Sequence, residues 1–227
     1  MNRTAKLSQS SFELAKWVAI AAMAVDHYGK IVAPDWYLPT HMIGRAAFPL
    51  FAWIIASRLA MRPELIAGYI RWLLPWAIVT QPAFYVAGRE WFEPNILFEL
   101  LAGVLVVYTI HRFGRSALSV AVTVVLAGVG WFFDYGPVGV LSIPLLFTMV
   151  RTGSKQTLAW LALIAVSVNL PAADSQDWWV VCAALSAPAI AALSLALQQG
   201  KLPRLPKLFF YAFYPLHLLF LTFLSRI

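Results

Sequence analysis

Long apolar stretches follow one another along this chain, and short segments between them hold most of the charged residues. Of the 227 residues, 61% are hydrophobic and 12% are charged, whereas soluble domains have about 45–50% apolar and about 25% charged residues. A soluble fold of this length would leave much of that apolar surface in water. The sequence therefore predicts an all-α fold in the lipid bilayer, a polytopic bundle of transmembrane helices that forms a single domain over residues 1–227.

A transmembrane helix uses about 20 apolar residues, so the chain has room for about nine spans and for no separate soluble domain. Prolines inside the apolar stretches predict kinked or broken helices, which often line cavities in membrane proteins. The predicted spans cover Phe12–Ala33, Leu38–Leu59, Leu65–Val86, Asn95–Ile110, Ser116–Phe133, Tyr135–Val150, Thr157–Pro171, Trp178–Gln198 and Leu208–Ser225.

The basic residues between these spans fall in every second connecting segment. By the positive-inside rule such segments face the cytoplasm, which predicts a cytoplasmic N-terminus and an extracytoplasmic C-terminus. The basic segments carry Arg3 and Lys6, Arg58 and Arg62, Arg112 and Arg115, Arg151 and Lys155, and Lys201, Arg204 and Lys207; the others carry Asp35, then Arg89, Glu90 and Glu93, then Asp134, then Asp174 and Asp177.

The net charge of +7 does not indicate a nucleic-acid partner, because the basic residues are isolated or paired rather than gathered on one polar stripe. The chain has a single cysteine, and its four histidines lack the close spacing of metal ligands. We therefore expect no metal site.

The first predicted span carries two ionisable residues that cannot remain outside the membrane. The apolar run from Trp17 to Val25 is nine residues long, too short to cross a bilayer, so the helix spans only with Asp26 and His27 inside it. Ionisable residues near the bilayer centre cost at least about 2.5 kcal/mol on insertion scales and usually face a cavity and a partner. Because Asp26 and His27 are adjacent on a helix, they point about 100° apart, and we expect the partner of His27 to come from another span.

Other polar residues fall at a similar depth in other spans. Counted at about 1.5 Å per residue from the middle of each span, Asp26, Arg45 and Glu99 lie roughly 5 Å to the outer side of the midplane. We interpret these residues as one polar chamber inside the membrane. Further polar residues in the outer or middle part of their spans are His41, Gln81, Asn95, Asp134, Tyr214 and His217.

The residue types alone leave three roles open. A salt bridge of Asp26 or Glu99 with Arg45 would only hold helices together. An imidazole such as that of His27 can act as a general base while Arg45 stabilises an oxyanion, which fits acyl transfer. The same carboxylates and histidines also fit the proton relay of a transporter.

Short motifs occur in a fixed order along nearly the whole chain, at residues 16–27, 43–52, 69–73 with 81–82, 95 with 100–103, 134–136 with 139–141, and 210–217. Each motif is weak alone, but their order and spacing together resemble the TraX family, the pilin N-acetylases of conjugative transfer systems. The resemblance implies a multi-pass acetyltransferase of the bacterial inner membrane, related to the broader group of membrane acyltransferases. Its acetyl donor would be acetyl-CoA, and its partner and acceptor the N-terminal amine of a pilin subunit.

The resemblance also implies site residues. The expected catalytic residues are His27, Asp26, Arg45 and Asp134, and the expected substrate-binding residues are Gln81, Asn95, Tyr214 and His217, to which we add Glu99 from its depth alone. Because acetyl-CoA is cytosolic and the amine lies outside, the donor must reach through the protein. Its phosphates are expected at Arg58, Arg71 or Arg112, with Arg62 and Arg115 as further candidates, although the positive-inside rule alone would also require most of these arginines. Arg71 is preferred because it lies inside a span.

Three other functions remain open. Some conjugative pilins are joined head to tail, and the same site would serve that reaction because it also acylates the amine. A proton-coupled transporter would use the same polar residues without binding coenzyme A. An inactive assembly scaffold would need neither.

Overall fold

A computed structural model describes residues 12–88, 92–153, 156–169, 178–197, 203 and 206–227 of the chain. Over these residues the regular structure consists of α-helices and short 3-10 segments without a strand, which confirms the predicted all-α class. The α-helices are α1 (Glu13–Ile31), α2 (Tyr37–Gly44), α3 (Ala47–Met61), α4 (Ile66–Val86), α5 (Ile96–Phe113), α6 (Ala117–Val129), α7 (Gly136–Arg151), α8 (Thr157–Asn169), α9 (Trp178–Ala184), α10 (Ser186–Ala196) and α11 (Lys207–Leu224).

Three segments of the described chain are long and apolar enough to cross a bilayer: Pro34–Met61, Ile96–Phe113 and Lys207–Leu224. Four shorter apolar helices accompany them, at Ala117–Phe132, Gly136–Arg151, Thr157–Asn169 and Val181–Ala196. The count of nine spans and the orientation of the termini stay predictions. Part of the charge pattern behind that orientation, at Arg3, Lys6, Arg89, Glu90, Lys155, Asp174, Asp177, Lys201 and Arg204, lies outside the described residues, as do the ends of two predicted spans at Pro171 and Gln198.

Two of the predicted spans are broken helices. The second is divided into α2 and α3 at Arg45, and the eighth into α9 and α10 at Leu185. In both, a proline is the third residue of the following helix: Pro49 lies four residues after Arg45, and Pro188 four residues after the end of α9. A proline lacks the N–H that would bond the carbonyl four residues earlier and its ring collides with that carbonyl, so the helix breaks there.

Small residues allow α1 and α2 to approach closely. A methyl group added at Gly29 would overlap the side chain of Thr40, and one added at Gly44 would overlap the side chain of Asp26. Since α2 leads into α3, this close packing also sets the position of the chain break at Arg45 relative to α1. The small residues Gly29 and Gly44 therefore bring Asp26 of α1 close to Arg45, which directly follows α2.

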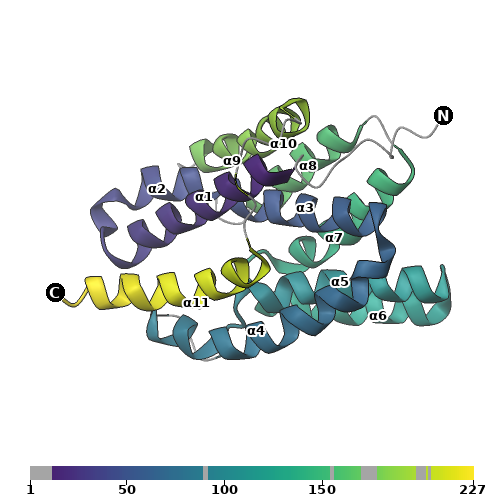
Figure 1. The fold of residues 1–227 in the computed structure, drawn as a ribbon, viewed down its shortest axis with the longest axis horizontal. Helices are drawn as coiled ribbons and strands as arrows, with labels where there is room; N and C mark the ends of the chain where they lie inside the picture. The colour runs from purple at the N-terminus through teal and green to yellow at the C-terminus, as the bar shows by residue number, and fades with distance from the viewer. Residues whose placement is uncertain (1–11, 89–91, 154–155, 170–177, 198–202, 204–205) are drawn as a thin grey trace.

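Helix α3 lies in the interior, where Leu50, Trp53 and Leu59 are among its fully buried side chains. It packs against α1 and α7, while α4 packs against α5 and α11. Figure 1 shows α11, in yellow, lying between α1 and α4, and the group α8 to α10, in green, on the opposite side of α1. Helix α11, the last in the chain, therefore packs against α1, the first described helix, and against α4.

Candidate active site

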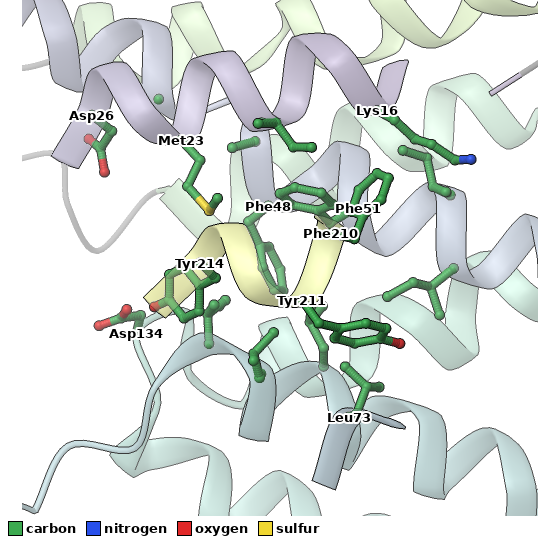
Figure 2. A pocket seen from close by; sticks show the side chains of 18 of the residues that line it. Lys16, Met23, Asp26, Phe48, Phe51, Leu73, Asp134, Phe210, Tyr211 and Tyr214 are labelled. Carbon is green, nitrogen blue, oxygen red and sulfur yellow. The ribbon is translucent and has the colours of Figure 1, made fainter. Parts of the chain in front are cut away.

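A cavity of about 670 Å³ runs between α1, α3, α4 and α11. One face of α1 lines it along its length, with Lys16, Ile20, Met23, Asp26 and Lys30 at helical spacings of three or four residues. At 1.5 Å per residue this face extends for about 20 Å. Figure 2 shows Asp26 at one end of the pocket, Lys16 at the other and Met23 between them.

Asp26 is the centre of a buried charged cluster at the first end. Its Oδ1 accepts a hydrogen bond from His41 Nδ1 at 2.8 Å, and its Oδ2 accepts one from Lys30 Nζ at 2.7 Å. Arg45 Nη2 lies 3.8 Å from the same Oδ1. Asp26, His41 and Arg45 are all buried. We refer to Asp26, Lys30, His41 and Arg45 as the Asp26 cluster, in which one carboxylate is surrounded by three basic side chains.

Arg45 lies at the break between α2 and α3 and lines the cavity. Its Nη1 donates to Asn169 Oδ1 of α8 at 3.2 Å, and its guanidinium carbon lies 5.7 Å from the centre of the Tyr135 ring. Its Nε–H has no hydrogen-bond partner among the described residues. A buried donor without a partner is costly, so an acceptor atom that reached this N–H would stabilise the site.

His27 lies beside the Asp26 cluster and also lines the cavity. Its Nδ1 lies 2.6 Å from Nε2 of His217 on α11, so its partner does come from another helix, as expected. His217 itself does not line the cavity. The structure therefore brings the two histidines into contact and places His217 outside the wall of the cavity.

Asp134 and Tyr214 line the same end of the cavity as Asp26. Asp134 precedes the first turn of α7 and is exposed, whereas Tyr214 of α11 is buried. The ring of Tyr135, next to Asp134, stacks on Phe48 with ring centres 4.1 Å apart. Carboxylate, phenol and imidazole groups from three distant segments thus meet at this end.

The opposite end of the cavity is basic. Lys16, Arg58 and Lys207 line it from α1, α3 and α11. Lys16 is buried and its Nζ donates to Glu13 Oε1 at 2.7 Å, while Nζ of Lys207 lies 4.0 Å above the ring of Trp72. Between the two ends the wall is apolar and includes Met23, Phe48, Phe51, Ile54, Ile55, Leu73 and Phe210 (Figure 2).

Two of the predicted substrate-binding residues lie away from the cavity and bind each other. Gln81 Oε1 accepts hydrogen bonds from the backbone N–H of Asn95 at 2.9 Å and from its side-chain amide at 2.6 Å. The same amide donates to the carbonyl of Ala77, and Asn95 Oδ1 caps α5 by accepting from Leu97 N–H at 3.1 Å. Gln81 and Asn95, the α4–α5 clip, therefore join consecutive helices.

Glu99 does not line the cavity either, although it lies close to residues that do. It is 1% exposed, and neither of its carboxylate oxygens completes a hydrogen bond with the described residues. Asp134 and the backbone of Tyr135 are its electrostatic neighbours. A methyl group added at Gly139 would overlap its carboxylate, so Gly139 at the start of α7 provides the space for this side chain.

Of the three arginines expected to bind the donor phosphates, only Arg58 lines the cavity. Arg71 is exposed on α4, close enough to Lys207 to repel it electrostatically, and Arg112 is exposed near the end of α5. Sequence reasoning missed Lys16, Lys207 and Asn169. Lys207 lies near the end of a predicted span, where the positive-inside rule explained it, and Lys16 belonged to a motif without an assigned role. A lone asparagine in an apolar helix gives no sign of its partner.

No group of three or more histidine, cysteine, aspartate or glutamate side chains suited to a metal ion occurs within the part of the chain that the structure describes. The expectation that no metal takes part stays a prediction.

Comparisons with known proteins identify the family of the chain. The family model described as TraX protein matches residues 11–225. Over 170 residues, 72% of this chain and 67% of the relative, the chain is 31% identical to an Escherichia coli protein named Protein TraX. It is 28% identical over the same length to the Protein TraX of Escherichia coli strain K12. No solved structure gives a significant match.

Proposed function

The chain belongs to the TraX family, and from this premise we propose that it is an inner-membrane acetyltransferase. It would move an acetyl group from acetyl-CoA to the N-terminal amine of a conjugative pilin subunit. The observation that carries the proposal is one cavity that joins a basic end to the Asp26 cluster and His27. A cavity of this kind lets a donor held at one face of the membrane react with an acceptor at the other.

The residues of the cavity fit the chemical parts of acetyl-CoA. Phosphate groups suit the basic end, where Lys16, Arg58 and Lys207 line the wall and would neutralise their charge. The pantetheine arm suits the apolar middle. When bound, acetyl-CoA supplies an acyl group activated as a thioester. The buried Arg45 Nε–H, which lacks a partner in the described structure, suits the carbonyl oxygen of that group.

His27 would act as the general base. It removes a proton from the amine as the amine nitrogen bonds to the acyl carbon, and it returns that proton to the sulfur as the carbon–sulfur bond breaks. Arg45 donates its Nε–H to the oxygen that gains negative charge during this step. Asp26, bonded to His41 and Lys30 and ion-paired with Arg45, would hold the cluster and balance its charge rather than react.

The acceptor would enter at the end that holds Asp26. Lys30, Tyr37 and Asp134 line this end and are partly or fully exposed. The carboxylate of Asp134 offers a negative charge to an amine that arrives protonated, and this ammonium would lose one proton to water at the exposed end before the neutral amine reaches His27. A pilin whose new N-terminus lies outside the membrane would reach His27 by this route.

The intact mass of the pilin subunit tests this function. Cells of a conjugative system that contains this protein would carry the wild-type chain, His27→Ala, His111→Ala or no copy of the gene. We expect pilin to gain one acetyl group with the wild type and with His111→Ala, and none in the other two strains. His111 is the matched control because it is exposed and bonded to Arg151, away from the cavity.

Each other result has a definite meaning. Pilin that loses one water with the wild type and not with His27→Ala would indicate head-to-tail joining by the same base. Pilin of equal mass in all four strains would overturn acetylation and favour a transporter or an assembly scaffold. The amount of protein in the membrane, measured for each variant, separates loss of chemistry from loss of the protein.

A further inference from the structure

The two histidines His27 and His217 are joined in a fixed geometry. Their rings are nearly parallel, at 12°, and the ring centres are 4.9 Å apart, although Nδ1 of one lies only 2.6 Å from Nε2 of the other. Two imidazoles that meet edge to edge in nearly one plane have this combination of distances. The contact is therefore a hydrogen bond between ring nitrogens, with little overlap of the ring faces.

The second nitrogen of His217 decides the direction of this hydrogen bond. Nδ1 of His217 lies 2.8 Å from the carbonyl oxygen of Phe213, and a carbonyl only accepts, so this Nδ1 carries the hydrogen. In the neutral ring, Nε2 of His217 then has the lone pair and accepts. His27 must supply the hydrogen from its own Nδ1, which leaves the lone pair of His27 on Nε2.

The carboxylate that is nearest to His27 in sequence already has other partners. Asp26 is its neighbour in sequence, but the two oxygens of Asp26 accept from His41 and Lys30. The orientation of His217 is itself supported by the ring of Phe213, which lies parallel to it at 11° with centres 4.8 Å apart. The base is thus oriented by an imidazole, where many enzymes use a carboxylate.

We propose that His217 is a positioning residue, which holds His27 in the Nδ1–H tautomer so that Nε2 is the atom that accepts the proton of the acyl acceptor. The part of this inference that concerns the reaction rests on the proposed function, whereas the part that concerns the tautomer does not. His217 does not line the cavity, so it acts through His27 and does not bind substrate. This replaces the substrate-binding role that the sequence predicts for it.

The tautomer is measured without any reaction. Protein labelled with ¹⁵N-histidine and reconstituted in lipid vesicles gives separate NMR signals for protonated and unprotonated ring nitrogens, and the His27 signals are those lost in His27→Gln. We expect hydrogen on Nδ1 in the wild type. A spectrum with hydrogen on Nε2 of His27 would overturn the proposal even if the protein acetylates pilin.

Two substitutions of His217 form a matched pair. Glutamine can place an acceptor oxygen near the position of Nε2, whereas asparagine reaches only as far as Nδ1. We expect His217→Gln to keep the tautomer and most of the activity. His217→Asn should lose the tautomer preference and lower kcat by about tenfold to a hundredfold, part of the roughly 10²- to 10⁴-fold that a positioned base contributes.

The kinetic assay uses protein and pilin subunit in the same vesicles with varied acetyl-CoA. KM for acetyl-CoA should be unchanged in both variants, because His217 lies away from the basic end of the cavity. Equal kcat in His217→Asn and the wild type, or a raised KM with an unchanged kcat, would contradict a positioning role. If the wild type shows no turnover while NMR reports the Nδ1–H tautomer, the proposed function fails and the structural assignment stands.

Discussion

Two polar clusters lie among the helices of this protein. They differ in whether they line the cavity and in whether all their hydrogen-bond donors have partners. In the α4–α5 clip, Gln81 and Asn95 bond to each other and to nearby backbone groups, and neither lines the cavity. In the Asp26 cluster, every member lines the cavity, Arg45 also bonds to the distant Asn169, and its Nε–H has no partner in the described structure. Satisfied polar groups hold helices together, whereas a buried donor without a partner calls for another explanation, such as a ligand.

The largest effect is expected from a change to that donor. Arg45→Lys keeps the positive charge but removes the Nε–H and one of the two groups that bind Asp26 and Asn169. We expect acetyl transfer to pilin to slow by about 10²- to 10³-fold, the usual cost of losing one oxyanion donor. The rate is measured from pilin mass over time. Arg151→Lys is the control, because Arg151 is exposed and bonded to His111.

A rate for Arg45→Lys within threefold of the wild-type rate would contradict a catalytic role for Arg45. In that case the Asp26 cluster would be a second structural clip, the internal salt bridge that the sequence leaves open. The midpoint of thermal unfolding in detergent, measured on the same preparations, shows whether any loss comes from folding.

Sequence reasoning placed Asp26, Arg45 and Glu99 at one depth because counting residues along regular helices gives the depth of each polar side chain. The side chains of Asp26 and Arg45 do meet, but the prediction did not include Lys30 of the Asp26 cluster. The same counting could not separate Asn95 from Arg45, since both are polar residues in apolar spans. What separates them is whether each donor finds an acceptor after packing, which depends on contacts such as that of Arg45 with Asn169, 124 residues away.

Substitutions in the α4–α5 clip should lower the stability of the protein and leave its acetylation rate nearly unchanged. Asn95→Ala removes the cap of α5 and leaves the carbonyl of Ala77 and the amide oxygen of Gln81 without the side-chain amide that now donates to both. We expect a loss of stability of about 1–3 kcal/mol, from the lost cap and the lost hydrogen bonds of the side-chain amide, while Gln81 Oε1 keeps the backbone N–H of residue 95.

Thermal unfolding of Asn95→Ala in detergent measures this loss, and the acetylation rate per folded molecule should stay near that of the wild type. Asn95→Ser serves as the control, because its hydroxyl oxygen can still cap α5 while the donor to Ala77 and Gln81 is gone, and its loss should be smaller. An Asn95→Ala variant of normal stability with a strongly reduced acetylation rate would support the substrate-binding role that the sequence predicts for Asn95.

Glu99 falls between the two clusters, because it is buried like Asn95 and lacks hydrogen bonds like the Nε of Arg45. A methyl group in Gly139→Ala would overlap its carboxylate, so we expect a destabilisation of about 1–3 kcal/mol, as for overpacking in a core. Gly128→Ala is the matched control: nothing lies near that position, and alanine favours a helix over glycine by about 1 kcal/mol.

The double variant Gly139→Ala with Glu99→Ala identifies the cause. Removing the carboxylate should reduce the cost of alanine at position 139 and leave the part caused by the side chain of Tyr135, which the methyl group would also overlap. The reduction appears as a coupling free energy between positions 139 and 99. Additive effects of the two substitutions on thermal unfolding would show that the Gly139 methyl group meets something other than Glu99.

Substitutions of Arg58 and Arg112 should have the smallest effect and give the most selective test. Both are arginines near the end of a helix, α3 or α5, and only Arg58 lines the cavity. If the basic end holds the phosphates of acetyl-CoA, Arg58→Ala removes one charge-assisted contact and raises KM for acetyl-CoA by about tenfold, equivalent to about 1.4 kcal/mol. Arg112→Ala should leave KM unchanged. Equal KM values in both variants would mean that Arg58, like Arg112, serves only the orientation of the chain in the membrane, and the donor would then have to bind through Lys16 and Lys207 without it.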